Sequence, residues 1–117
     1  MLPREDNYLM DMLNAAKLAQ EFVANVSWEN FQSDLMRQAA VTRQFEIIGE
    51  AARRISEDSH AEMPEIPWHQ IIGMRNRIAH EYDRINLVRL WDTIHIALPE
   101  LIAVLEKIIK TIKSSGV

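Results

Sequence analysis

The segment NLVRLWDTIHIALPELIAVLEKIIKTIK, residues 86–113, decides the fold class of this chain. Its apolar residues recur three and four positions apart, which is the period of an α-helix and not of a strand. Asn86 is placed to cap the start of one long helix, and we expect Pro99 to kink that helix near its middle. The apolar stripe comprises Leu87, Leu90, Trp91, Ile94, Leu98, Leu101, Leu105, Ile108 and Ile112.

The same period occurs twice upstream of this segment. One stripe predicts a helix over about residues 6–26, and a second stripe predicts a helix that ends within residues 56–59. Between them, Ser27 is expected to cap a short connecting helix, and Ser33 offers another cap for the helix that follows. Gly49 lies in the second long helix, where its missing side chain would allow close contact with a neighbouring helix.

A polar stretch with two prolines, residues 57–67, is expected to form the longest loop of the chain. Pro67 suits the first turn of a third long helix, because its missing N–H costs nothing there. Four main helices with short connections and one short connecting helix predict an all-α antiparallel helical bundle. At 117 residues the chain can bury one core but not two, so we expect a single domain over residues 1–117.

The composition excludes several function classes. The chain has no cysteine, so disulfides, thiolate metal sites and cysteine nucleophiles are ruled out, and a reducing, cytoplasmic setting is expected. No apolar run approaches the roughly 20 residues needed to cross a bilayer, so no membrane partner is expected. A net charge of −4 argues against a broad nucleic-acid-coating surface, so any RNA site must be local.

The stretch GMRNRIAHEYD, residues 73–83, carries the candidate chemistry. Arg75 supplies a guanidinium that can hold a phosphate, Asn76 an amide that can orient it, and His80 an imidazole that transfers protons near neutral pH. RNA contains its own nucleophile, the 2′-hydroxyl, so these groups suffice to cleave it without a metal or another cofactor and to leave a 2′,3′-cyclic phosphate. The stretch therefore predicts a metal-independent endoribonuclease.

Helical geometry complicates a site made from one helix. Asn76 and His80 are four residues apart and share a face, whereas Arg75 lies about 140° around the helix from His80. Two copies of this helix that meet across a two-fold axis would place Arg75 of one subunit near His80 of the other and would supply two imidazoles. We therefore expect a homodimer with a composite active site.

Arg75-Asn76-x-x-x-His80, extended by His80-x-Tyr82, resembles the Arg-polar-x-x-x-His motif of the HEPN superfamily, and the chain is most similar to the HepT family. The similarity also includes Ile48-Gly49-Glu50-Ala51-Ala52, Ile66-Pro67-Trp68, Trp91 and Leu98-Pro99. It implies a HEPN-like helical-bundle dimer that acts as an RNase toxin on tRNA or mRNA. It also implies a partner, the minimal nucleotidyltransferase antitoxin MntA.

The resemblance assigns a role to each motif residue. Arg75 is implied to bind the phosphate and to stabilise the transition state, Asn76 to orient it, and His80 to transfer protons. Tyr82 is implied to be the residue that MntA adenylylates. A nucleotide at Tyr82 would block the cleft and would repel an RNA phosphate by its negative charge.

Other charged residues have less specific interpretations. Arg77 and Arg84 are candidate RNA-binding residues. With Arg53, Arg54 and Arg89 they could form a basic rim around the cleft, although ordinary solvated arginines fit most of these positions equally well. Glu46 and Glu50 are spaced as a helix pair, but no histidine or second pair accompanies them, so a solvated face is favoured over a metal site.

The remaining histidines and aromatic residues favour structural roles. His60 and His69 lack ligand partners at metal-binding spacing and are expected to be solvated. His95 borders the apolar stripe and fits a buried, hydrogen-bonded or interface residue. The aromatic side chains are expected to pack in the core and not to stack on bases, and they are Tyr8, Trp28, Trp68 and Trp91.

Two other functions stay open at this point. The chain could be a non-catalytic binding module that docks a nucleotidyltransferase, with the same helices serving only as an interface. It could also be the antitoxin of a pair in which the nucleotidyltransferase is the toxin. The binding module predicts that the purified protein does not cleave RNA, and separate expression of each protein tests the antitoxin alternative.

Overall fold

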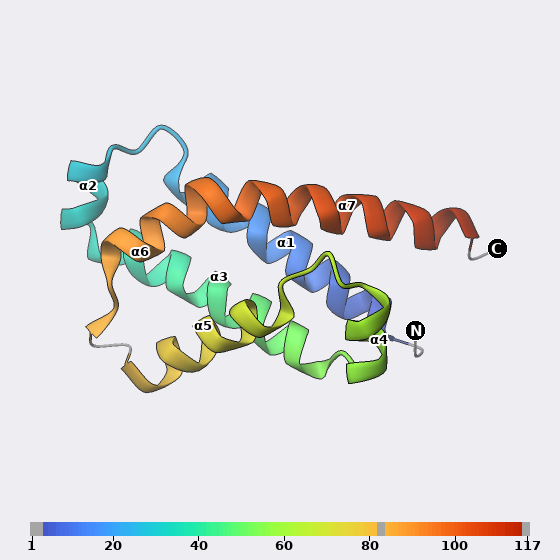
Figure 1. Ribbon diagram of the computed structural model, residues 1–117. Coiled ribbons are helices and arrows are strands. Elements are labelled where there is room, and N and C mark those ends of the chain that lie inside the picture. Colours follow the sequence, from blue (N-terminus) through green and yellow to red (C-terminus); the bar gives the residue numbers. More distant parts are fainter. Residues whose placement is uncertain (1–3, 82–83, 116–117) are drawn as a thin grey trace.

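Helices form all the regular structure of the computed structural model, which describes residues 4–81 and 84–115 (Figure 1). They are α1 (Glu5–Val23), α2 (Trp28–Ser33), α3 (Leu35–Arg54), α4 (Glu57–Glu62), α5 (Trp68–Glu81), α6 (Leu87–Asp92), the π-helical turn η2 (Thr93–Ala97) and α7 (Leu98–Ser115). Four long helical segments, the last made of α6, η2 and α7, run alternately in opposite directions (Figure 1). The predicted all-α bundle is confirmed, with two short helices, α2 and α4, where one was expected.

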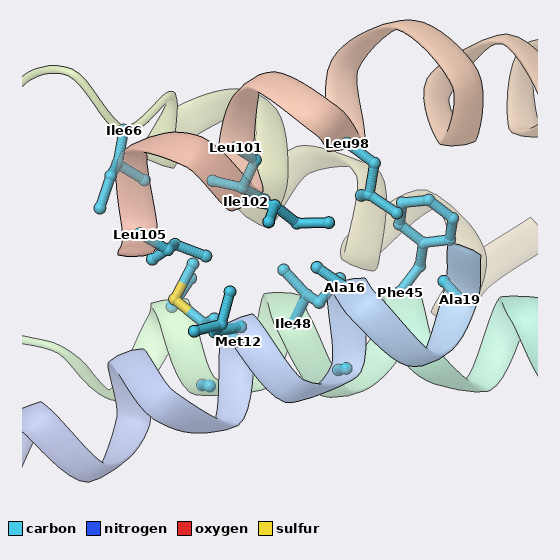
Figure 2. Packing of buried hydrophobic residues seen from close by; sticks show 14 of the residues in the cluster. Met12, Ala16, Ala19, Phe45, Ile48, Ile66, Leu98, Leu101, Ile102 and Leu105 are labelled. Atoms are coloured by element: carbon cyan, nitrogen blue, oxygen red, sulfur yellow. The ribbon is translucent and has the colours of Figure 1, made fainter. Parts of the chain in front are cut away.

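The core lies between α1, α3 and α7. Helix α1 packs against both α3 and α7, while α5 packs against the other side of α3. Met12, Val41 and Leu105 are completely buried there, and each such burial stabilises the fold by about 1.5–3 kcal/mol. Figure 2 shows how residues of α1 and α3 face those of α7, with Met12, Ala16 and Ile48 opposite Leu98, Leu101, Ile102 and Leu105. The predicted stripes therefore form the core.

Helix α1 ends at Val23, three residues before its predicted end. Ala24 already has a ψ of 125°, outside the α-helical region, and Asn25 follows with a φ of 62°, in the left-handed region, so the helix ends although Val26 continues the apolar stripe. Ser27 then caps α2, as predicted, because its Oγ accepts a hydrogen bond from the backbone N–H of Asn30 at 3.1 Å. The apolar period thus predicts the helix, and turn chemistry sets its end.

The cap of α3 is Asp34, and the expectation that Ser33 caps this helix is wrong. Asp34 Oδ1 accepts a hydrogen bond from the backbone N–H of Arg37 at 3.0 Å. The hydroxyl of Ser33 instead donates back to the carbonyl of Asn30 at 3.2 Å. The Arg37 guanidinium pairs with Asp34 Oδ2 at 3.1 Å and also donates to the carbonyl of Phe22, which ties the start of α3 to the end of α1.

Part of the expected long loop is the short helix α4, so the prediction of a loop over residues 57–67 is wrong in its first half. Ser56 caps α4 by accepting from the backbone N–H of Ser59 at 3.2 Å. The buried carboxylate of Glu5 accepts from the backbone N–H of Ser56 at 2.6 Å and from Ser59 Oγ at 2.5 Å. This tertiary contact with α1 stabilises a helix that has no apolar stripe of its own.

The last helical segment starts at the predicted cap, since Asn86 Oδ1 accepts from the backbone N–H of Arg89 at 3.1 Å. Its irregularity lies in η2, which ends at Ala97, two positions before Pro99. Proline has no N–H to donate to the carbonyl of His95 four residues earlier, and the chain widens into a π-helical turn there. No helix within the described ranges is long and apolar enough to cross a membrane.

Aromatic side chains join α2 to α6. The ring of Trp91 lies 5.8 Å from that of Trp28 and 5.1 Å from that of Phe31, measured between centroids. Phe31 is completely buried, and the two tryptophans are half-buried. These tilted ring contacts confirm that the aromatic residues pack within the bundle.

Candidate active site

Helix α5 carries the candidate catalytic residues, and its start is fixed by Trp68. The indole N–H of this buried residue donates to the carbonyl of Met63 at 3.0 Å. Pro67 directly precedes the helix, and its carbonyl accepts the hydrogen bond from Ile71 at 3.0 Å. The proline therefore lies at the helix start, as predicted, and α5 extends from this anchored end along α3.

Helix α5 approaches α3 closely where Arg75 passes over Gly49. A Cβ atom added at Gly49 would lie only 2.1 Å from Cβ and 2.6 Å from Cγ of Arg75. Only a glycine leaves room for the Arg75 side chain to pass this closely over α3. The predicted close helix contact at Gly49 is confirmed, and its partner is the candidate catalytic arginine itself.

The guanidinium of Arg75 is held on two sides. Its Nη2 forms an ion pair with Glu50 Oε2 of α3 at 3.2 Å, and its Nη1 donates to Asn76 Oδ1 at 3.2 Å. The Arg75 side chain is 26% exposed, so it is half-buried but open to solvent on part of its surface. Such a guanidinium is oriented in advance and keeps N–H groups for a phosphate.

His80 lies in the last turn of α5, and its side chain is exposed. Its imidazole has no hydrogen bond or ion pair to another residue within the described parts of the chain. Five positions separate it from Arg75, which corresponds to about 140° around the helix. One copy of α5 therefore presents the two side chains in different directions. Tyr82, the expected modification site, lies outside the described residues.

Comparison with known proteins identifies the family. Residues 12–108 match the family model described as HepT-like, ribonuclease HepT-like. The chain belongs to the HepT-like ribonuclease family. It is similar to "Probable ribonuclease HepT" of Thermococcus cleftensis, with 38% identity over 89% of this chain and 94% of the relative. No solved structure gave a significant match.

Two further relatives of this HepT-like chain carry RNase names. One is a "Putative RNase" of Methanocaldococcus jannaschii, 34% identical over 80% of this chain and 86% of its own length. The other is a "Putative RNase" of Caldanaerobacter subterraneus subsp. tengcongensis, 35% identical over 80% of this chain and 84% of its own. These similarities support an RNase of the HEPN type.

The two candidate RNA-binding arginines of the HepT-like chain share one cleft. Arg77 and Arg84 are exposed and line a small hollow of about 100 Å³ between α5 and α6, together with Arg89. Glu81 also lines it, so three cations face one described carboxylate. The basic rim anticipated from the sequence thus divides into this cleft and a second group, Arg53 and Arg54 on α3.

A larger, mainly apolar groove of about 240 Å³ lies beside α5 and reaches η2 and α7. Ile71 and Met74 of α5 line one side, and Thr93, Ala97 and Leu98 line the other. Helix α5 therefore packs against α3 while a second apolar strip along it faces an open groove. Ile96 of η2 is 67% exposed but does not line this groove.

Sequence patterns missed the role of Glu50. A solvated face was favoured for it, yet its carboxylate lies at the α3–α5 contact and pairs with Arg75. Among the described residues, Glu46, one turn earlier, forms an ion pair only with Arg43, at 4.0 Å, so the expected solvated face fits Glu46 better than Glu50. The signal available in the sequence was the Gly49-Glu50 pair, in which a small residue allows helix contact and the next residue is charged.

The other histidines are structural or exposed. His60 is half-buried, so the expectation that it is solvated is wrong: its ring stacks on Trp68 at 4.1 Å, and its Nε2 lies 2.9 Å from the carbonyl of Ala52. His69 is exposed, as expected. His95 is exposed, with Nδ1 2.8 Å from the carbonyl of Trp91. Among the described residues no group of three potential metal ligands occurs.

Proposed function

We propose that this chain is a metal-independent endoribonuclease toxin of a toxin–antitoxin pair. It cleaves RNA, either tRNA or mRNA, at an active site formed by Arg75, Asn76 and His80 across a homodimer. Family membership supports the RNase activity, and the residue chemistry of α5 supports the assignment of the site.

The proposal rests on the burial and the side-chain contacts of Arg75. Its guanidinium is half-buried at a tight helix contact and is held by Glu50 and Asn76, while it stays open to solvent on part of its surface. An arginine with a purely structural role would be covered, and a purely solvated one would not be fixed on two sides. A phosphate group fits the remaining N–H donors of such a fork.

The reaction uses the substrate's own nucleophile. A neutral His80 removes the proton of the 2′-hydroxyl, and the 2′-oxygen attacks the adjacent phosphorus. The bond from phosphorus to the 5′-oxygen breaks, and a protonated His80 gives its proton to that oxygen. Arg75 neutralises the charge that builds up on the phosphate oxygens in the transition state. The products are a 2′,3′-cyclic phosphate and a 5′-hydroxyl end.

The homodimer supplies both imidazoles. Arg75 and His80 of one α5 point in directions about 140° apart, so the two side chains of one helix do not point toward the same phosphate. Across a two-fold axis, Arg75 of one subunit and His80 of the other can meet. The apolar groove beside α5 provides a surface that a second subunit would cover.

The second partner is an MntA-like nucleotidyltransferase that adenylylates Tyr82. This residue follows His80 by two positions, so a nucleotide attached to it would lie close to the imidazole. The added phosphate is negatively charged and bulky, and it would exclude an RNA phosphate from Arg75. Intact-mass measurement after co-expression with the transferase tests this step, with Tyr82→Phe as the variant that should stay unmodified.

The test of the activity is cleavage of total RNA by purified protein in the presence of a chelator. Wild type should generate new 3′ ends that carry cyclic phosphates, while His80→Ala should not. His69→Ala is a matched control, because His69 is an exposed histidine at the opposite end of the same helix. If both histidine variants cleave as wild type does, the site assignment fails.

Failure of the wild type itself has a different meaning. A folded, unmodified and dimeric wild-type protein that leaves RNA intact would support a binding module or an antitoxin instead. Expression in cells separates these two, because the toxin of the pair arrests growth when it is expressed alone. Growth arrest by the nucleotidyltransferase and not by this chain would assign the antitoxin role to this chain.

A further inference from the structure

The carboxylate of Glu50 contacts three guanidiniums at the junction of α3 and α5. Its Oε2 lies 3.2 Å from Nη2 of Arg75. Its Oε1 lies 3.3 Å from Nε of Arg54 and 3.6 Å from Nη2 of Arg53, both on the last turn of α3. One oxygen therefore faces the candidate catalytic arginine, and the other faces two arginines of Glu50's own helix.

This division fixes the direction of the carboxylate. Arg53 and Arg54 lie three and four positions after Glu50, which is the spacing at which side chains of one helix meet. Glu50, together with Tyr8, raises the pKa of Arg54 above its usual range. Because a carboxylate is planar, holding Oε1 on α3 sets the position of Oε2 toward α5.

The contact with Arg75 is the least exposed ion pair of the three. The side chains of Arg75 and Glu50 are 26% and 34% exposed, while those of Arg53 and Arg54 are 53% and 59% exposed. It joins residues 25 positions apart, directly beside the tight contact of Gly49 with Arg75. A half-buried pair between two helices is screened less by solvent than a surface pair within one helix.

The charged groups around Glu50 carry a net positive charge, which favours binding of an anion. Three guanidiniums surround one carboxylate, so the cluster keeps a net positive charge in a chain whose total is −4. Glu50 therefore holds Arg75 without cancelling the local attraction for a phosphate. If Arg75 alone faced Glu50, the carboxylate would compete with the substrate for that arginine.

We propose that Glu50 is the positioning residue for Arg75. It fixes the guanidinium from the α3 side while Asn76 holds the other Nη, so that Arg75 meets the phosphate in one orientation. Glu50 itself contacts no reacting atom. This inference rests on the proposed ribonuclease activity, and its effect falls on the chemical step more than on binding of RNA.

The test measures kcat and KM on an oligoribonucleotide with a single cleavage site. Glu50→Gln should lower kcat by about tenfold to a hundredfold with KM changed less than about threefold, because a misoriented group weakens the transition state more than the ground state. Glu50→Asp keeps the charge but is one methylene too short to reach Arg75, and it should lower kcat similarly. Glu46→Gln, the matched carboxylate one turn earlier, should match wild type.

The second arm repeats Glu50→Gln in an Arg75→Lys background. Lysine has no planar fork to orient, so the further loss in kcat should be less than about threefold there. An equal loss in both backgrounds would show that Glu50 acts on folding or elsewhere, and would overturn the inference. Wild-type kcat in Glu50→Gln would overturn it too.

The design distinguishes a loss of activity caused by misfolding from a loss caused by a misoriented Arg75. Each variant is compared with wild type by far-UV circular dichroism and urea midpoint, and Glu50→Asp replaces Glu50→Gln if the latter does not fold. Cleavage by wild type and not by His80→Ala, with an unaffected Glu50→Gln, rejects only the positioning role. No cleavage by wild type rejects the proposed function and the positioning role together.

Discussion

Gly49→Ala should destabilise the protein, although alanine is the better helix former. Inside a helix this exchange alone is worth about 1 kcal/mol in favour of alanine. The new Cβ atom would, however, lie 2.1 Å from Cβ and 2.6 Å from Cγ of Arg75. Non-bonded carbons approach to ~3.5–4.0 Å, so α3 and α5 must separate by more than about 1 Å at this point.

The magnitude follows from these two opposing effects. Rotation about χ1 can move Cγ of Arg75, but Cβ is bonded directly to the backbone, so rotation cannot remove the clash at 2.1 Å. The cost therefore belongs at the upper end of the ~1–3 kcal/mol typical of overpacking. Subtracting about 1 kcal/mol for helix propensity leaves a net loss of about 2 kcal/mol in the free energy of unfolding. In a domain of this size, that corresponds to a fall in Tm of roughly 8 °C.

The assay is urea unfolding followed by far-UV circular dichroism at one fixed protein concentration, since dimerisation would make stability depend on concentration. Gly73→Ala is the matched control: Gly73 lies inside α5, and a Cβ there meets no heavy atom within 4 Å. That variant should gain about 1 kcal/mol. The two midpoints should therefore shift in opposite directions. A Gly49→Ala midpoint at or above that of wild type would refute the close contact with Arg75.

Two further predictions concern charge. The backbone N–H and the guanidinium of Arg37 hold the pKa of Asp34 below its ordinary 3.8. Asp34→Asn keeps the cap but loses this charge, so wild type should be the more stable protein above pH 3.8, with an advantage that fades as the pH falls through the lowered pKa; an advantage independent of pH between 2 and 6 would contradict this assignment. Arg77→Gln and Arg84→Gln should each raise KM with little change in kcat. Each should also reduce the slope of log KM against log salt concentration by about one, because one phosphate contact is lost. Unchanged KM and salt slope in both variants would remove them from the RNA surface.

The long helices were predictable because each has its own apolar stripe. The stripe around Leu98 and Leu105 forms the core in the structure as the spacing predicts, and Asn86 and Ser27 act as caps where their side-chain chemistry places them. These features depend on residues within one or two turns of each other. A single sequence contains all the information that such local features need.

Features that depend on distant residues were missed. Helix α4 is short and polar, and its stability comes from the buried carboxylate of Glu5, 51 positions from Ser56. His60 is half-buried because the chain brings Trp68 against it. Neither contact leaves a periodic signal, since each requires two helices to pack in one particular register.

The candidate site shows the same difference between local and distant features. Arg75, Asn76 and His80 were selected from residue type and spacing within one helix. Glu50 was not, because its pairing with Arg75 depends on how α5 lies across α3. The sequence placed Glu50 on a helix and next to a glycine, but only the packing of α5 on Gly49 decides that the carboxylate faces Arg75.

Gly49 and Glu50 therefore couple the packing of the bundle to the geometry of the site. Any expansion at Gly49 displaces Cβ and Cγ of Arg75 directly, and the guanidinium moves away from Glu50 with them. A displacement above about 1 Å exceeds the roughly 0.5 Å within which catalytic groups must be held. Gly49→Ala should consequently lose most of its kcat at temperatures where it is still fully folded, whereas a core truncation of equal cost far from α5 should keep its activity until it unfolds.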